Sequence, residues 1–349
     1  MNVLTGISKA SWHPVITADT TTPSYWLNWR VLVCSIWIMT SISLTVFLIS
    51  RYEGPQNSRN QSRETQQGKA SGGVLYEDEL WKPCLRGIHP VWLLAYRLVA
   101  FFVLLVMLSL NGAADGGTIF CYYTQWTFTL ITIYFGLGSL ISMFGCYKHH
   151  KKVGGDRIVN LEMDGDSEQG TLHSSEPPKF IEAPAFRKEF PCNGQDRELA
   201  GFWGYVFQVI FQMNAGAVVL TDCVFWFIIV PFLTRKDYDL NFLLISMHSI
   251  NVVFLLGEAA LNSLRFPWFR IAYFFLWTTV YVVFQWILHS AHSTWWPYPF
   301  LDLSNQHAPL WYLSLALLHI PCYGIFVMIM KLKHSVFSRS FGPSYHGVY

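Results

Sequence analysis

The chain alternates long apolar runs with polar connections. Seven runs are long enough to cross a bilayer, whose hydrocarbon core needs about 20 mostly apolar residues per helix. The predicted spans are 31–50, 91–110, 119–145, 207–233, 241–264, 268–290 and 310–330. The pattern therefore predicts an all-α fold, a polytopic transmembrane helical bundle.

The polar segments divide the chain into an N-terminal arm (1–30), a bundle (31–331) with two long loops (51–90 and 147–200), and a tail (332–349). Both loops are rich in Gln, Ser, Asn, Gly, Pro or acidic residues and poor in large apolar side chains. Such segments cannot bury enough apolar surface to fold, so we expect the two loops to be disordered.

Basic residues are distributed unevenly between the two sets of connections. Nineteen of the 24 Lys and Arg residues lie in loops 51–90, 146–200 and 265–270 and after residue 330, and only four lie on the other side. The positive-inside rule then predicts an outside or luminal N-terminus and a cytosolic C-terminus. The membrane would be an endomembrane (ER) or the plasma membrane. The sequon at Asn60 would face the cytosol and stay unmodified.

Composition supports a membrane protein and excludes several other classes. The chain is 52% hydrophobic and only 13% charged, whereas soluble domains carry about a quarter charged residues. Its seven cysteines form no CxxC pair, which argues against a disulfide scaffold or a metal module. The sequence contains no Gly-rich phosphate loop, no GxSxG motif and no nucleic-acid surface, and we expect no cofactor.

Ionisable residues inside the spans are few: Arg97, Asp222, His248, Glu258 and His319. Such residues are costly in hydrocarbon and usually face the bundle interior or a wet cavity. Arg97 and Glu258 both lie near the cytosolic ends of their spans, so we expect a structural ion pair between them. An alternative is that Arg97 snorkels to the headgroups.

Two spans carry polar residues along one face. In the third span these are Gln125, Thr129, Thr132, Gly136 and Ser139, and in the fifth Asn241, His248, Asn251, Glu258 and Asn262. The hydroxyls of the third span can simply bond their own helix backbone. Five polar residues in register along the fifth span instead indicate a buried network or a facing cavity.

Helix depth allows three of these side chains to meet. At 1.5 Å per residue, Thr132 lies about 20 Å, Asp222 about 16 Å and His248 about 10 Å from the luminal ends of their spans. A hydroxyl and an imidazole in one wet pocket are the minimum for acyl transfer. Thr132 would then be the nucleophile, His248 the general base and Asp222 the residue that orients the imidazole.

Other polar residues have more ordinary interpretations. His289 and His292 could hold a metal with Asp302, but a cap within a belt of Trp and Tyr side chains is the preferred interpretation. His319 is expected to bond a carbonyl freed by Pro321. We expect Gln208 and Gln212 to form hydrogen bonds between helices.

Three stretches resemble a known enzyme family. They are YYTQWTFTLITIYFG (122–136), LNFLLISMHSINVVFLLGE (240–258) and WWPYPFLD (295–302), and they resemble motifs of the androgen-induced transmembrane hydrolases. The whole chain, including WKPCLRGIHPVWLLAYR (81–97), looks like the related rolling stone-like membrane proteins. The resemblance to the androgen-induced hydrolases implies hydrolysis of fatty acid esters of hydroxy fatty acids, with Thr132 and His248 as the catalytic pair. The chain departs from the family pattern in two places. The Asn-His step that precedes the family histidine is Asn241-Phe242 here, and the Thr that follows the histidine is Ser249.

The leading hypothesis is therefore a membrane-embedded threonine hydrolase of lipid esters, whose partners are the bilayer and an acyl-lipid ester substrate. The alternative is a non-enzymatic multi-pass membrane protein that acts in cell-surface signalling, adhesion or fusion. A transporter or channel would also fit buried charges, but the sequence shows no broken helices at matching positions.

Overall fold

The computed structural model describes residues 18–54, 75–166, 198–233 and 242–345. Within these residues the structure is helical, without a β-strand, and seven helices are long and apolar enough to cross a membrane. They are Trp29–Glu53, Pro90–Ala114, Tyr123–Lys151, Phe202–Pro231, Leu243–Leu261, Trp268–Ala291 and Ala308–Ser340. The predicted all-α bundle of seven spans is confirmed, and the chain is an integral membrane protein.

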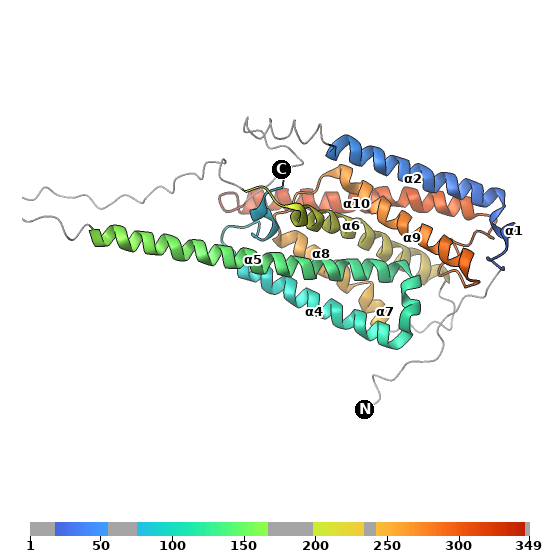
Figure 1. Cartoon of the computed structure of the whole chain (residues 1–349), viewed down its shortest axis with the longest axis horizontal. Coiled ribbons are helices and arrows are strands. Elements are labelled where there is room, and N and C mark those ends of the chain that lie inside the picture. Colours follow the sequence, from blue (N-terminus) through green and yellow to red (C-terminus); the bar gives the residue numbers. More distant parts are fainter. Residues whose placement is uncertain (1–17, 55–74, 167–197, 234–241, 346–349) are drawn as a thin grey trace, which may run out of the picture.

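Figure 1 shows these spans as a bundle of roughly aligned helices. The long helices are α2 (Trp29–Glu53), α4 (Pro90–Asp115), α5 (Tyr123–Asp166), α6 (Phe202–Val224), α9 (Ile271–Ala291) and α10 (Ala308–Ser340). The fifth span consists of α7 (Phe242–Met247) and α8 (Ile250–Leu261). Shorter elements are α1 (Pro23–Trp26), η1 (Glu77–Leu80), η2 (Gly116–Cys121), the π-helix η3 (Phe225–Leu233) and η4 (Trp268–Arg270).

Local sequence sets where several helices begin and end. The Asn28 side chain accepts a hydrogen bond from the Arg30 amide and caps α2. Pro90 occupies the first turn of α4, where its missing N–H costs nothing. Gly116 ends α4 with a φ of 67°, a left-handed conformation that glycine adopts without a steric penalty. These signals fix the two ends of α4 within a few residues of the predicted span.

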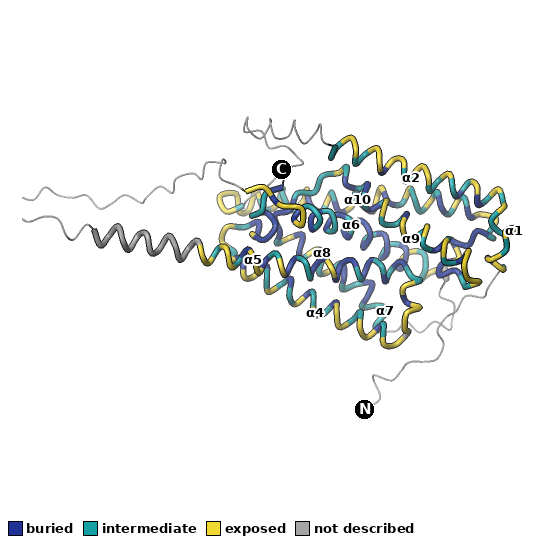
Figure 2. Tube along the Cα trace, in the orientation of Figure 1, coloured by how far each residue is buried: buried dark blue, intermediate teal, exposed yellow. Residues whose placement is uncertain are grey.

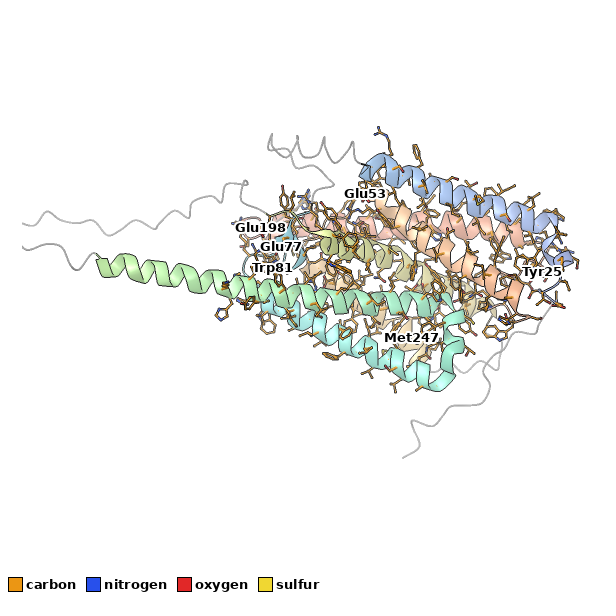
Figure 3. The ribbon with its side chains drawn as sticks, viewed as in Figure 1. Tyr25, Glu53, Glu77, Trp81, Glu198 and Met247 are labelled. Atoms are coloured by element: carbon orange, nitrogen blue, oxygen red, sulfur yellow. The ribbon has the colours of Figure 1, made fainter. Side chains whose placement is uncertain are left out.

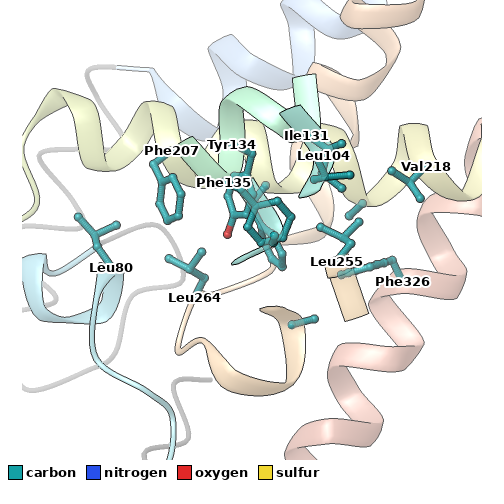
Figure 4. Packing of buried hydrophobic residues seen from close by; sticks show 14 of the residues in the cluster. Leu80, Leu104, Ile131, Tyr134, Phe135, Phe207, Val218, Leu255, Leu264 and Phe326 are labelled. Carbon is teal, nitrogen blue, oxygen red and sulfur yellow. The ribbon is translucent and has the colours of Figure 1, made fainter. Parts of the chain in front are cut away.

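Helix α6 lies at the centre of the bundle. It packs against α5, α9 and α10, whereas α2 packs on α9 and α10, and α4 packs on α5. Figure 2 accordingly shows exposed positions along the outer faces of α2 and α4. A cluster of buried aromatic and aliphatic side chains fills the space around α5 and α6, with the Tyr134 and Phe207 rings stacked at a centroid distance of 4.6 Å (Figure 4).

One end of the bundle gathers segments that are distant in sequence. Residue 76 pairs with 199, residue 83 with 262, and residue 85 with 345 through isolated backbone bridges. Figure 3 places Glu53, Glu77, Trp81 and Glu198 at this end and Tyr25 at the opposite one. We call it the charged end. The connections that we predicted to share one side of the membrane therefore do meet, while the orientation of the termini stays a prediction.

The predicted disorder of the two loops is wrong for parts of them. Residues 75–90 of the first loop fold against the bundle, with Leu75, Leu80 and Trp81 buried. Helix α5 runs on to Asp166, into the second loop, and α10 continues to Ser340, into the predicted tail. The helices extend because Lys, Arg and Ser, although polar, are compatible with helix. Residues 55–74 and 167–197 lie outside the described residues, as does most of the N-terminal arm.

Two spans that we expected to be continuous helices are irregular. The fourth passes from α6 into η3, where Pro231 lacks a backbone donor. The fifth breaks between α7 and α8, and the Asn251 side chain accepts a hydrogen bond from the Val252 amide, one of the first-turn amides of α8 that have no partner within the helix. Asp222 and His248 lie next to these irregular turns.

Candidate functional site

His248 lies at the break of the fifth span. Its amide still donates to the Leu244 carbonyl at 3.2 Å, but the next amide, that of Ser249, bonds the Ser246 carbonyl in a tighter turn. The imidazole stacks flat on the Phe225 ring, with centroids 3.7 Å apart. The side chain is 4% exposed. The break therefore directs the ring towards the fourth span and holds it there by aromatic packing.

Asp222 faces this imidazole from the end of α6. Its Oδ1 lies 3.4 Å from Nδ1 of His248, which is an ion-pair distance without hydrogen-bond alignment. Among the described residues neither carboxylate oxygen of Asp222 has a hydrogen-bond partner. A carboxylate at this position is the nearby acceptor for a proton on Nδ1 of His248. The predicted proximity of Asp222 and His248 is thus present.

Thr132 is placed differently. Its side chain is buried, and its hydroxyl donates to the Phe128 carbonyl of its own helix at 2.7 Å. Among the contacts of the described residues, no hydrogen bond joins this hydroxyl to His248, and Thr132 does not line the cavity described next. Ser139, seven residues or about two turns further along the same helix, bonds the Phe135 carbonyl in the same way. The structure therefore brings Asp222 and His248 together, whereas the Thr132 hydroxyl bonds the backbone of its own helix.

A cavity of about 110 Å³ lies within the bundle beside His248. Its walls come from α2, α5, α6, η3, α9, α10 and the loop that precedes α10, and most of the lining is apolar or aromatic. A water needs at least about 10–15 Å³ of such volume, so the space takes several waters or a short stretch of acyl chain. The cavity also reaches His319 and Thr278, which sequence reasoning did not connect.

Thr278 and His319 come from α9 and α10 and meet across the cavity wall. The Thr278 hydroxyl oxygen lies 2.9 Å from Nε2 of His319, and the Tyr123 hydroxyl lies 2.8 Å from the same oxygen. Nδ1 of His319 lies 2.7 Å from the Leu315 carbonyl. The expectation that His319 satisfies a carbonyl freed by Pro321 is therefore wrong, since Pro321 frees the carbonyl of Leu317. No pattern in the sequence indicates that α5, α9 and α10 meet at this point. The only signal was that His319 is an ionisable residue inside a span.

Arg97 and Glu258 form the expected ion pair, fully buried near the charged end. Nη2 of Arg97 lies 2.6 Å from Oε1 of Glu258, and Nε lies 3.1 Å from both carboxylate oxygens. The remaining guanidinium nitrogen donates to the Leu80 carbonyl and the Ser142 hydroxyl. The Tyr134 hydroxyl also donates to Glu258, at 2.9 Å. This network joins α4, α5 and α8. The alternative prediction, that Arg97 snorkels to the lipid headgroups, is therefore wrong.

The remaining predicted polar residues have structural roles. Gln208 and Gln212 both donate to the Arg265 carbonyl, which lies in the connection between α8 and η4, so these two bonds join a helix to a loop and not two helices as predicted. His289 is buried, bonds the Gln285 carbonyl through Nδ1 and stacks on Trp296 at 3.7 Å. Within the described part of the chain no group of three or more His, Cys, Asp or Glu residues is arranged to hold a metal. Of the predicted polar seam in the fifth span, Asn241 lies outside the described residues.

Comparison of the chain with protein-family models, with curated proteins and with solved structures found no match.

Proposed function

We propose that this integral membrane protein hydrolyses acyl-lipid esters inside the bilayer. The observation that carries the proposal is the buried His248–Asp222 contact at the edge of a mostly apolar cavity. An apolar cavity within a bundle suits an acyl chain that enters from the surrounding lipid, and the imidazole supplies a base beside it. The resemblance to the androgen-induced hydrolases supports the same function, whereas the resemblance to the rolling stone-like proteins favours the second function described below.

In this mechanism Asp222 holds the proton on Nδ1 of His248 and leaves Nε2 free to act as the base. Thr132 is the proposed nucleophile, and its hydroxyl leaves the Phe128 carbonyl when the substrate binds. Its Oγ attacks the ester carbonyl carbon while the hydroxyl proton moves to Nε2 of His248, and the bond to the alcohol then breaks as the alcohol takes that proton. Water attacks the acyl-threonine, gives a proton to His248 and releases the fatty acid as Thr132 regains its proton. We further propose that the N-terminus is outside or luminal, the C-terminus cytosolic, and the membrane the ER or the plasma membrane.

A second function has one observation in its favour. The Thr132 hydroxyl is fully engaged with its own backbone, as it would be in a protein that binds a lipid without cleaving it. Such a non-enzymatic membrane protein would act in cell-surface signalling, adhesion or fusion through the same cavity.

The two functions differ in turnover. We expect purified protein to hydrolyse a long-chain p-nitrophenyl ester and to react with a fluorophosphonate probe. His248→Ala and Thr132→Ala should each lower both rates by about 100-fold or more, as loss of a general base or nucleophile does. Asp222→Asn should lower them less.

The matched control is Ser139→Ala, which removes an equally buried, backbone-bonded hydroxyl from the same helix. Well-folded wild-type protein that binds a fatty acid but shows neither turnover nor labelling would rule out the hydrolase and leave the non-enzymatic function.

A further inference from the structure

The cavity has a second polar site, formed by Tyr123, Thr278 and His319. Each residue comes from a different helix, α5, α9 and α10 respectively, and all three line the cavity. The Thr278 hydroxyl oxygen is at the centre, 2.8 Å from the Tyr123 hydroxyl and 2.9 Å from Nε2 of His319. The arrangement is a hydroxyl already within hydrogen-bond reach of an imidazole, which the Thr132–His248 pair lacks.

The hydrogen-bond partners fix the direction of each proton. The Leu315 carbonyl can only accept, so Nδ1 of His319, 2.7 Å away, must carry the ring proton. In the neutral ring Nε2 is then an acceptor, and the Thr278 hydroxyl donates to it at 2.9 Å, with the Phe274 carbonyl of its own helix as a more distant acceptor at 3.4 Å. Thr278 has a single hydroxyl proton, so the Tyr123 hydroxyl donates to the Thr278 oxygen. The chain of bonds therefore runs from Tyr123 through Thr278 to His319.

The imidazole is also held rigidly. His319 is 2% exposed and lies between the rings of Phe274 and Phe275, at centroid distances of 4.4 and 4.6 Å. A hydroxyl bonded to an imidazole that a third group orients is the geometric signature of an activated nucleophile. Here the Leu315 carbonyl is the orienting group and Thr278 is the hydroxyl.

We propose that Thr278 and His319 form a second nucleophile–base pair, which attacks an acyl-lipid ester bound in the cavity. The inference rests on the proposed hydrolase function, because it assigns an attacking hydroxyl for the same class of substrate. Tyr123 donates to the Thr278 oxygen and so holds it beside Nε2 of His319.

The reaction balances without a cofactor. A bond forms between Oγ of Thr278 and the ester carbonyl carbon while the hydroxyl proton moves to Nε2 of His319. The bond from that carbon to the alcohol oxygen then breaks, and the alcohol leaves with the proton from Nε2. Water attacks the acyl-threonine, gives a proton to His319, and releases the fatty acid as Thr278 regains its proton.

The test is to identify the threonine that a fluorophosphonate probe modifies. Purified full-length protein is labelled, digested and analysed by mass spectrometry, and p-nitrophenyl ester turnover is measured in parallel. We expect an adduct on Thr278 in the wild type. In the Thr132→Ala background, Thr278→Ala and His319→Ala should remove the labelling and turnover that remain, whereas Thr278→Ser, which keeps a hydroxyl, should retain most of both. Tyr123→Phe should lower turnover more than substrate affinity.

The matched control is Thr45→Ala, which removes a buried threonine hydroxyl of α2 that faces α9 outside the cavity. An adduct on Thr132 alone, with the turnover that remains in Thr132→Ala unchanged by Thr278→Ala, would overturn this inference and keep the proposed function. Absence of any adduct and of turnover in folded wild-type protein would overturn both. Thermal stability of each variant in detergent separates these outcomes from misfolding.

Discussion

Replacing Glu258 with alanine should leave the Arg97 guanidinium buried without its counter-ion. Both side chains are 0% exposed, and Glu258 accepts from Nε and Nη2 of Arg97 and from the Tyr134 hydroxyl. After the substitution Arg97 keeps only the Leu80 and Gly138 carbonyls and the Ser142 hydroxyl. These neutral acceptors satisfy hydrogen bonds but do not neutralise the charge.

The magnitude follows from burial. Removal of one partner of a buried ion pair costs about 3–5 kcal/mol, whereas an exposed pair contributes about 0–1 kcal/mol. At about 2–4 °C per kcal/mol, Glu258→Ala should lower the melting temperature by about 6–20 °C. Glu258→Gln should have a smaller effect of the same sign, because the amide oxygen still accepts one bond. The control is Asp78→Ala, which breaks the solvent-exposed Lys82–Asp78 pair.

The assay is thermal unfolding of detergent-purified protein followed by fluorescence-detected size exclusion. The double variant Arg97→Met with Glu258→Met should recover much of the loss, since it removes both buried charges and keeps similar volumes. Equal and small shifts for Glu258→Ala and Asp78→Ala would refute the argument. So would a double variant no more stable than Glu258→Ala alone.

Two other predictions concern packing and orientation. Gly216→Ala should destabilise the bundle by about 1–3 kcal/mol, because its Cβ would lie 2.3 Å from the Phe274 ring. Gly324→Ala meets nothing within 4 Å and should stabilise by about 0.5–1 kcal/mol in the same melting assay. For orientation, the sequon at Asn60 should stay unglycosylated in cells, whereas His307→Thr, which completes a sequon on the opposite side, should add a glycan that a glycosidase removes. Modification at Asn60 alone would invert the proposed topology.

The seven spans could be predicted because length and hydropathy are local properties of the sequence. The Arg97–Glu258 pair was predictable too, since few charges lie inside the spans and these two have opposite sign near the same end. The prediction that residues 75–90 are disordered is wrong. It rested on the polar composition of the whole loop and did not consider the apolar residues Leu75, Leu80 and Trp81. Trp81 packs directly on Gly145 of α5, where an added Cβ would lie 2.2 Å from its ring.

The candidate site was less accessible to sequence reasoning. Asp222 and His248 were paired on helix depth, and the structure supports that pairing although the fifth span is broken at His248. Thr132 lies on the predicted polar face of its helix, but its hydroxyl bonds the backbone of that helix. Residue spacing does not show which of several possible hydrogen bonds a hydroxyl will form. The Thr278–His319 contact depends on how α9 and α10 pack, and periodicity within either helix carries no information about it.

The charged end also determines how the chain tolerates change. Lys148, near the end of the third span, forms an ion pair with Glu198, 50 positions later, and residues 76 and 199 are bridged beside it. The two ends of the intervening segment are therefore held together at the charged end. Doubling the length of that segment would cost only about 0.6 kcal/mol in loop-closure entropy. A fluorescent reporter spliced into 167–197, or a protease cut there, should leave the two halves of the molecule joined and their interior unchanged.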